Sequence, residues 1–272
     1  MDISRARTSI AEPADEHRRP AGPEPFWADV WEIDFAGDAP SGDALGGFVR
    51  LTLLPNQGLA WWWTSLLTPR LVAVRDHDVP LPRAGLEVRA DGLWGELVCE
   101  TALEHWSIGL EAFGIAYDDP ADAWGDEWGE RLPVGLDLEW EATAGAAGVG
   151  PAGPAPEGDG VAYAHPGTVH GEILVGPDRI EFSGTGFRSR ASGVLDWWSG
   201  GPHRRTVWVG PDGLAHGSDA PARCGGVLGR APVLVTAPGR PPVRLERTLG
   251  RFGDGSAPDS LGWAEAFPEE PA

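Results

Sequence analysis

A two-residue alternation of apolar and polar side chains is the feature that most constrains how this chain can fold. Between residues 134 and 141, leucine or tryptophan at 136, 138 and 140 alternates with a carboxylate at 137, 139 and 141. Residues 168–175 alternate in the same way, and this period is typical of strands with one buried and one solvated face. Shorter runs occur at 47–54, 71–74, 86–89, 93–99, 106–115, 179–183, 206–209, 233–236 and 243–249.

Turn sequences separate these runs, among them Ala90-Asp91-Gly92 and Gly210-Pro211-Asp212-Gly213. No long helical stripe accompanies them, so the sequence predicts an all-β fold of antiparallel strands.

The composition changes sharply between residues 143 and 160, where fourteen of eighteen residues are Gly, Pro or Ala. Such a stretch buries little and resists a regular ladder, so we expect a linker there. It would divide the chain into a β domain at 25–142 and a second at 161–268, preceded by a flexible tail at 1–24. We expect two barrels or sandwiches packed together, with a ligand cleft between them.

Charge excludes several classes of partner and enzyme. Arginine supplies all 21 cations against 41 carboxylates, for a net charge of −20, which repels phosphate backbones and anionic lipids. The absence of lysine removes Schiff-base catalysis and the Walker phosphate loop. The expected partner is a hydrophobic small molecule, not nucleic acid.

The chain carries no sequence signal for export or for a membrane. It has two cysteines, which favours a reduced, cytoplasmic protein, and residues 1–25 contain no apolar run. The uncharged stretch 51–69 is interrupted at 55–58 by Pro-Asn-Gln-Gly, which predicts a turn between two strands and no integral membrane segment.

Metal and cofactor motifs are incomplete. His170-Gly171-Glu172 matches half of the deaminase signature but lacks the cysteine pair. Asp76-His77-Asp78 would alternate between two faces of a strand, and the acidic residues 118–130 lack calcium-loop spacing. Gly184-Thr185-Gly186 does not open a helix, as a dinucleotide fingerprint would. We therefore expect no metal and no cofactor.

Tryptophan clusters point to an apolar ligand. The chain has fourteen tryptophans, with runs at 61–63 and 197–198. In a strand such a run places indoles on both faces, so one face can be core while the other lines a cavity. Indole faces stack on polyenes and stabilise positive charge. The alternative interpretation is ordinary packing in a tryptophan-rich barrel.

A resemblance to a known family rests on specific segments. Residues 163–173 read YAHPGTVHGEI, residues 184–188 read GTGFR and residues 193–198 read GVLDWW. They resemble the hallmark region of carotenoid 1,2-hydratase (hydroxyneurosporene synthase) relatives, a superfamily of two lipocalin-like barrels that includes Diels–Alder-type natural-product cyclases. Residues 53–58 and 262–265 extend the resemblance to about residues 45–267. It implies a lipocalin-like fold and a polyene, terpenoid or polyketide ligand.

The chain departs from that hallmark in its acid–base residues. The family pattern is Gly-x-Gly-x-Arg-Asp-His-Ser-Trp-Gly-x-Arg-Asp-Trp. Arg188, Gly193, Asp196 and Trp197 match it, whereas residues 189–192 read Ser-Arg-Ala-Ser. The second family arginine is replaced by Leu195. The strongest proton-transfer pair of the family is therefore missing.

Two carboxylates could replace that pair. Asp196 is the remaining acid of the hallmark, and Glu111 shares a predicted strand face with Phe113 and Ile115. An apolar environment there would keep the Glu111 carboxyl protonated. Either carboxylate could instead be structural, for instance paired with Arg188.

The resulting functional hypothesis is a cofactor-independent cyclase or isomerase, or a hydro-lyase, acting on a hydrophobic substrate in a tryptophan-lined cavity. The alternatives are a non-catalytic binding protein for a hydrophobic metabolite and a purely structural role. The predicted catalytic residues are Asp196, Glu111 and Arg188. The predicted ligand-binding residues are Trp61, Trp62, Trp63, Trp197, Trp198, Tyr163 and His170.

Overall fold

The computed structural model describes residues 11–38, 42–125, 129–146, 157–195, 197–198, 204–210, 215–218, 223–253 and 260–267. These residues form fifteen strands and three short 3-10 helices, and no α-helix occurs within the described ranges. The predicted all-β fold is therefore confirmed. The elements are η1 (Pro13–Glu16), β1 (Trp27–Asp38), β2 (Ala44–Leu54), η2 (Pro55–Gln57), β3 (Leu59–Leu67), β4 (Leu71–Pro80), β5 (Glu87–Ala90), β6 (Leu93–Thr101), β7 (His105–Tyr117), η3 (Pro120–Trp124), β8 (Glu130–Ala142), β9 (Glu157–Val175), β10 (Asp178–Val194), β11 (Arg204–Val209), β12 (Ala215–Ser218), β13 (Arg223–Val235), β14 (Val243–Gly253) and β15 (Ser260–Ala266).

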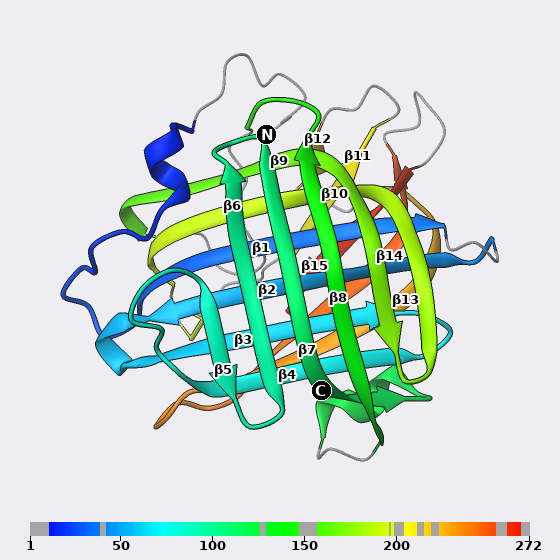
Figure 1. The fold of residues 1–272 in the computed structure, drawn as a ribbon, viewed down its shortest axis with the longest axis horizontal. Helices are drawn as coiled ribbons and strands as arrows, with labels where there is room; N and C mark the ends of the chain where they lie inside the picture. The colour runs from blue at the N-terminus through cyan, green and yellow to red at the C-terminus, as the bar shows by residue number, and fades with distance from the viewer. Residues whose placement is uncertain are drawn as a thin grey trace.

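Ten of the described strands form one antiparallel sheet in the order β4-β3-β2-β1-β10-β9-β8-β7-β6-β5. A further pairing of β4 with β7 joins Leu71–Ala73 to Ile115–Tyr117 and closes the sheet on itself. Figure 1 shows β6, β7 and β8 crossing steeply in front of β1–β4, so the closed sheet is a flattened barrel of two layers.

The long strands β9 and β10 form the corner between these layers. They pair with each other along most of their length, whereas β9 meets β8 only over residues 167–175 and β10 meets β1 only over residues 184–194. The backbones of β1 and β10 lie so close at this corner that residue 186 must be glycine. A Cβ at Gly186 would lie 2.1 Å from the carbonyl oxygen of Asp34.

A second sheet contains five of the described strands, in the order β12-β11-β15-β14-β13. It lies behind the barrel in Figure 1, with β13 against β3 and β4, and β15 against β1. Strands β1–β4 and β10 therefore form a middle layer between β5–β9 in front and β11–β15 behind.

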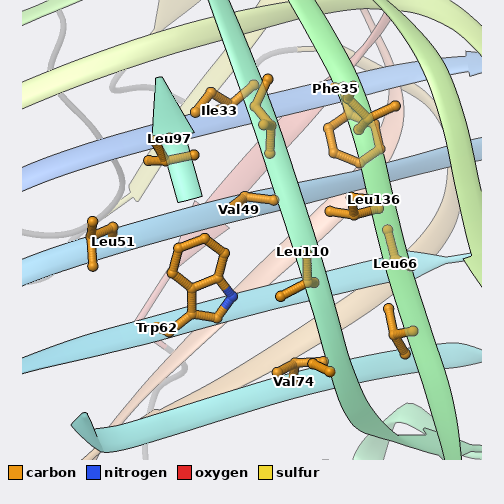
Figure 2. Close-up of a cluster of buried hydrophobic side chains, with 14 of the residues drawn as sticks. Ile33, Phe35, Val49, Leu51, Trp62, Leu66, Val74, Leu97, Leu110 and Leu136 are labelled. Carbon is orange, nitrogen blue, oxygen red and sulfur yellow. The ribbon is translucent and has the colours of Figure 1, made fainter. Parts of the chain in front are cut away.

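Each interface between layers has its own hydrophobic core. The front core lies inside the barrel, and Figure 2 shows side chains of β1–β4, such as Ile33 and Trp62, facing Leu97, Leu110 and Leu136 of β6–β8. The rear core lies between the middle layer and the second sheet and includes Val30, Trp63 and Trp263. A middle strand buried on both faces has few exposed positions, and β1 is buried from Trp27 to Gly37.

The large sheet takes strands from both sides of the glycine-, proline- and alanine-rich segment. Strands β1–β8 precede the segment, β9 begins within it at Glu157, and β10 pairs with β1. The division into folding units at 25–142 and 161–268 stays a prediction, and the change from the first sheet to the second falls after Val194. Within the predicted tail, Glu16 is buried against the barrel end.

No helix within the described part of the chain is long and apolar enough to span a bilayer.

Candidate functional site

A group of buried polar and aromatic side chains occupies one end of the barrel, next to η1. We call this group the Arg188 cluster. It consists of Glu16, Trp106, Trp140, Tyr163, His165 and Arg188.

Strand register brings these side chains together. His165 of β9 lies opposite Arg188 of β10, and Trp106 of β7 lies opposite Trp140 of β8. Because the strands place alternate residues inside the barrel, these positions face its interior. Trp106 and Trp140 also belong to the front core, so the cluster is continuous with the apolar interior of the barrel.

The carboxylate of Glu16 is held by donors from three strands. The Tyr163 hydroxyl donates to Oε1 at 2.6 Å, the Arg188 Nη2 donates to Oε1 at 2.5 Å, and Trp106 Nε1 donates to Oε2 at 2.8 Å. The side chains of Glu16 and Arg188 are both 0% exposed, so this is a fully desolvated ion pair.

Arg188 sits within a cage of aromatic rings. Its guanidinium carbon lies 5.1 Å from the centre of the Trp106 ring, 5.3 Å from that of Trp140 and 5.5 Å from that of Tyr163. Such distances are favourable for cation–π attraction, which is stronger where water is excluded.

The cluster has more hydrogen-bond donors than acceptors. Nε and Nη1 of Arg188 and Nε1 of Trp140 are buried and have no hydrogen-bond partner among the described residues. The ring nitrogens of His165 also lack a partner of normal geometry there. Buried donors without a partner carry a desolvation penalty, and an added acceptor oxygen would relieve it.

Burial keeps the two neighbouring titratable side chains, His165 and Tyr163, neutral. It lowers the pKa of His165 from 6.5 to about 4, and the positive charge of Arg188 acts in the same direction. Burial raises the pKa of Tyr163, although Arg188 opposes that rise. Near neutral pH the cluster therefore holds an unprotonated imidazole and a protonated phenol beside a guanidinium.

A second buried group of charges lies between the two sheets. Arg247 lies 2.7 Å from Asp34, 3.5 Å from Glu32 and 3.8 Å from Glu265, and Glu32 also pairs with Arg50 at 3.2 Å. Burial raises the pKa of Asp34 to about 7. Since these carboxylates and arginines compensate one another across the interface, the group joins the sheets.

The predicted tryptophans are buried on two different faces. Trp61 and Trp63 belong to the rear core together with Trp197, whereas Trp62 belongs to the front core. The prediction that consecutive indoles point to opposite faces is therefore confirmed. Trp198 is half-buried and donates a hydrogen bond to the carbonyl oxygen of Pro241 at 2.8 Å.

These indoles make specific contacts with protein groups. Trp61 and Trp63 stack with ring centres 5.8 Å apart, and Trp63 Nε1 donates to His77 Nε2 at 2.8 Å. Burial lowers the pKa of His77 to about 4, which keeps the ring free to accept that bond. Arg50 lies 5.1 Å from the centre of the Trp63 ring and 5.4 Å from that of Trp197.

The remaining predicted residues lie elsewhere. Glu111 is exposed, and its neighbour Phe113 is 53% exposed. The expectation of an apolar environment for Glu111 is wrong because Leu110 and Ala112 are the residues of β7 that face the front core. His170 is exposed on the outer face of β9, and Asp196 lies outside the described residues.

Of the predicted residues, the structure therefore brings Arg188 and Tyr163 together in one cluster. Sequence reasoning missed Glu16, Trp106, Trp140 and His165 as members. His165 is part of the YAHPG segment that carries the family resemblance, so that segment could have indicated it. Nothing in the pattern around Glu16 predicts that it packs against a strand far along the chain.

Two antiparallel sheets, one closed into a barrel with a charged aromatic cluster at its end, define an all-β protein with a candidate small-molecule site. The chain belongs to the family described as a domain of unknown function (DUF7064), whose model matches residues 12–224. That match includes both Glu16 and Arg188.

Comparison with solved structures found one that shares this fold and a second with a lower TM-score. An AttH-like protein from Nitrosomonas europaea is 12% identical with a TM-score of 0.56, covering 97% of this chain and 98% of the other. Kievitone hydratase from Nectria haematococca is also 12% identical, with a TM-score of 0.45 and coverage of 88% and 89%. At 12% identity, the likeness to the Nitrosomonas europaea protein concerns the fold alone. No curated protein matches the sequence.

Proposed function

We propose that the Arg188 cluster binds a hydrophobic small molecule through an oxygen atom. The protein then acts on it as a cofactor-independent isomerase, cyclase or hydratase. The expected substrates are polyenes, terpenoids or polyketides that carry a carbonyl or a comparable acceptor. The resemblance to carotenoid 1,2-hydratase relatives favours the same classes of substrate.

The observation that carries this proposal is the surplus of buried donors around Arg188. Two of its three guanidinium nitrogens and the neighbouring Trp140 Nε1 have no acceptor among the described residues. A carbonyl oxygen accepts up to two hydrogen bonds and would satisfy part of this surplus, and the apolar remainder of the ligand would contact the indoles that continue into the front core.

The neighbouring groups can move a proton next to such a carbonyl. His165 is unprotonated near neutral pH and would accept a proton from the carbon beside the carbonyl. The electron pair of that C–H bond would form an enolate, whose oxygen Arg188 stabilises in a site of low dielectric. Tyr163 would return a proton at another carbon, which isomerises the double bond, and the proton taken up by His165 would then pass to the Tyr163 oxygen and restore both neutral groups.

Tyr163 and His165 take the proton-transfer roles that the sequence suggested for Glu111, because the exposed Glu111 lies on the opposite face of its strand from the barrel interior. The role suggested for Asp196 stays a prediction. The indoles between the sheets contact one another and protein charges, so the proposal places the ligand at the barrel end.

Deuterium exchange tests the proposal without knowledge of the natural substrate. The protein is incubated in D₂O with a panel of terpenoid and polyketide ketones and enones, beginning with β-ionone. Mass spectrometry then follows deuterium incorporation. General acid–base catalysis contributes about 10²–10⁴-fold, so His165→Gln should slow incorporation by at least about 100-fold.

The control is His170→Gln, which changes an exposed histidine of the same strand and should leave the rate unchanged. Equal rates in wild type and His165→Gln would refute the proposed role of the cluster. Quenching of tryptophan fluorescence by the panel without incorporation or conversion would favour the alternative, a binding protein without catalysis.

A further inference from the structure

Glu16 differs from the rest of the Arg188 cluster in the element that carries it. The other five residues lie on strands of the barrel, whereas Glu16 ends the four-residue helix η1, outside both sheets. Its carboxylate nevertheless receives the hydrogen bonds from Tyr163, Trp106 and Arg188. The barrel end is thus a receptor for a carboxylate, occupied by one from the protein's own N-terminal segment.

The convergence of donors determines which chemical group fits there. A guanidinium, a phenol hydroxyl and an indole N–H approach both oxygens of one carboxyl group at 2.5–2.8 Å. Charge-assisted bonds of this length are among the strong ones, and they favour an anion with two oxygens over a neutral hydroxyl. The surrounding rings of the aromatic cage suit an apolar body attached to that anion.

We propose that Glu16 is a tethered competitor for a hydrophobic carboxylic acid, whose carboxylate takes the place of the Glu16 side chain when residues 11–19 move away. This rests on the proposed function of the Arg188 cluster and narrows its ligand class. The N-terminal segment then acts as an autoinhibitory strap over the site.

Apart from the Glu16 carboxylate, single hydrogen bonds and one small buried side chain hold this strap. Trp31 Nε1 donates to the Glu16 carbonyl at 3.2 Å, Arg190 Nη2 donates to the His17 carbonyl at 2.9 Å, Arg18 Nη1 donates to the Pro82 carbonyl at 2.9 Å, and the Arg19 amide donates to Asp29 at 2.8 Å. Ala11 is buried beside Tyr163. Residues 12–14 are exposed and pair with no strand. Displacement of residues 11–19 would therefore leave both sheets hydrogen-bonded, as expected of a locally opening segment.

A tethered carboxylate competes at high effective concentration, so its removal should increase the affinity for a free carboxylate. In Glu16→Gln, Arg188 keeps its positive charge but loses its anionic partner. A ligand carboxylate would then restore the pair, whereas a ligand alcohol would not. The gain should therefore be specific to the acid.

The test uses cis-parinaric acid and the corresponding parinaryl alcohol, which differ only in the head group. Binding is measured by energy transfer from tryptophan to the polyene. Glu16→Gln should bind the acid at least about tenfold more tightly than wild type, equivalent to about 1.4 kcal/mol, and the alcohol within about twofold. The matched control Glu24→Gln removes an exposed carboxylate of the same N-terminal region and should bind both probes as wild type does.

Amide hydrogen exchange of the wild-type protein provides a second measurement, which does not depend on whether the Glu16→Gln variant folds. Saturation with the acid should accelerate amide exchange across residues 11–19, including the Arg19 amide, whereas the alcohol should not. Unchanged or slower exchange with the bound acid would overturn the inference.

The outcomes separate the two proposals. If the probes bind but Glu16→Gln gives no preference for the acid, the tethered competitor is refuted while ligand binding at the cluster stands. If neither probe binds to wild type or to Glu16→Gln, the inference fails, and the binding function proposed for the cluster loses its support as well.

Discussion

Replacement of Arg188 by methionine should strongly destabilise the protein, because it leaves a buried charge without its partner. Methionine fills much of the arginine volume, so the packing of the aromatic cage is largely kept. The Glu16 carboxylate, which is 0% exposed, then keeps only the hydrogen bonds from Tyr163 and Trp106.

The expected magnitude follows from the burial of the pair. Loss of one partner of a buried ion pair costs about 3–5 kcal/mol, most of it due to the uncompensated charge that remains. The double variant Arg188→Met/Glu16→Gln removes that charge as well. It should therefore be less destabilised than Arg188→Met alone, by about 2 kcal/mol, which is a non-additive result.

Urea unfolding followed by tryptophan fluorescence measures these free energies through the transition midpoint and slope. The exposed pair Arg89–Glu87 provides the control, because its side chains are 74% and 42% exposed. Arg89→Met should change the free energy of unfolding by less than about 1 kcal/mol. A loss below about 1 kcal/mol in Arg188→Met, or a double variant as unstable as the sum of the single ones, would contradict this reasoning.

Three further predictions concern packing, pH and the interface between the sheets. Gly95→Ala would place a Cβ 2.6 Å from the Trp62 ring and should lower stability by about 1–3 kcal/mol in urea unfolding, whereas Gly226→Ala, with no atom within 4 Å, should be nearly neutral. Burial lowers the pKa of His165 from 6.5 to about 4 in the folded protein. Between these pH values the unfolded chain therefore binds more protons than the folded protein, and the free energy of unfolding falls as the pH drops through this window. His165→Gln should reduce the slope of unfolding free energy against pH by up to about 1.4 kcal/mol per pH unit in that window, and an unchanged slope would contradict the lowered pKa. Arg247→Met leaves the buried carboxylate of Asp34 without its ion-pair partner, while Glu32 keeps Arg50 and Glu265 keeps Arg205. It should cost about 3–5 kcal/mol in the same unfolding assay, and a change below about 1 kcal/mol would show that the group does not join the sheets.

The alternation of side chains was sufficient to predict the strands that have one solvated face. Strand β8 is the clearest case, since Leu136, Leu138 and Trp140 face the front core as the pattern indicates. The same reasoning missed β1, although Trp31, Ile33 and Phe35 alternate there with Glu32 and Asp34. The alternation does not mark a solvated face in this strand, because both carboxylates are buried between the sheets.

Strand β7 shows where alternation alone is ambiguous. Both faces of residues 106–115 include apolar side chains, and the face of Glu111 and Phe113 is the interior that the sequence predicts. The structure buries Leu110 and Ala112 instead and leaves Phe113 on the surface. Which face is buried depends on the strands that pack against it, and these come from distant parts of the chain.

The sequence by itself determined the fold class and the opposite faces of Trp62 and Trp63, because both depend on local period. A short motif also made Arg188 a candidate site residue. The partners of Arg188 depended on tertiary structure. Glu16 and Arg188 are separated by 172 residues, and their contact requires that η1 pack against the end of a barrel built from β1–β10. Local patterns fix which way a side chain points from its strand, whereas the closure of the sheet decides what it meets.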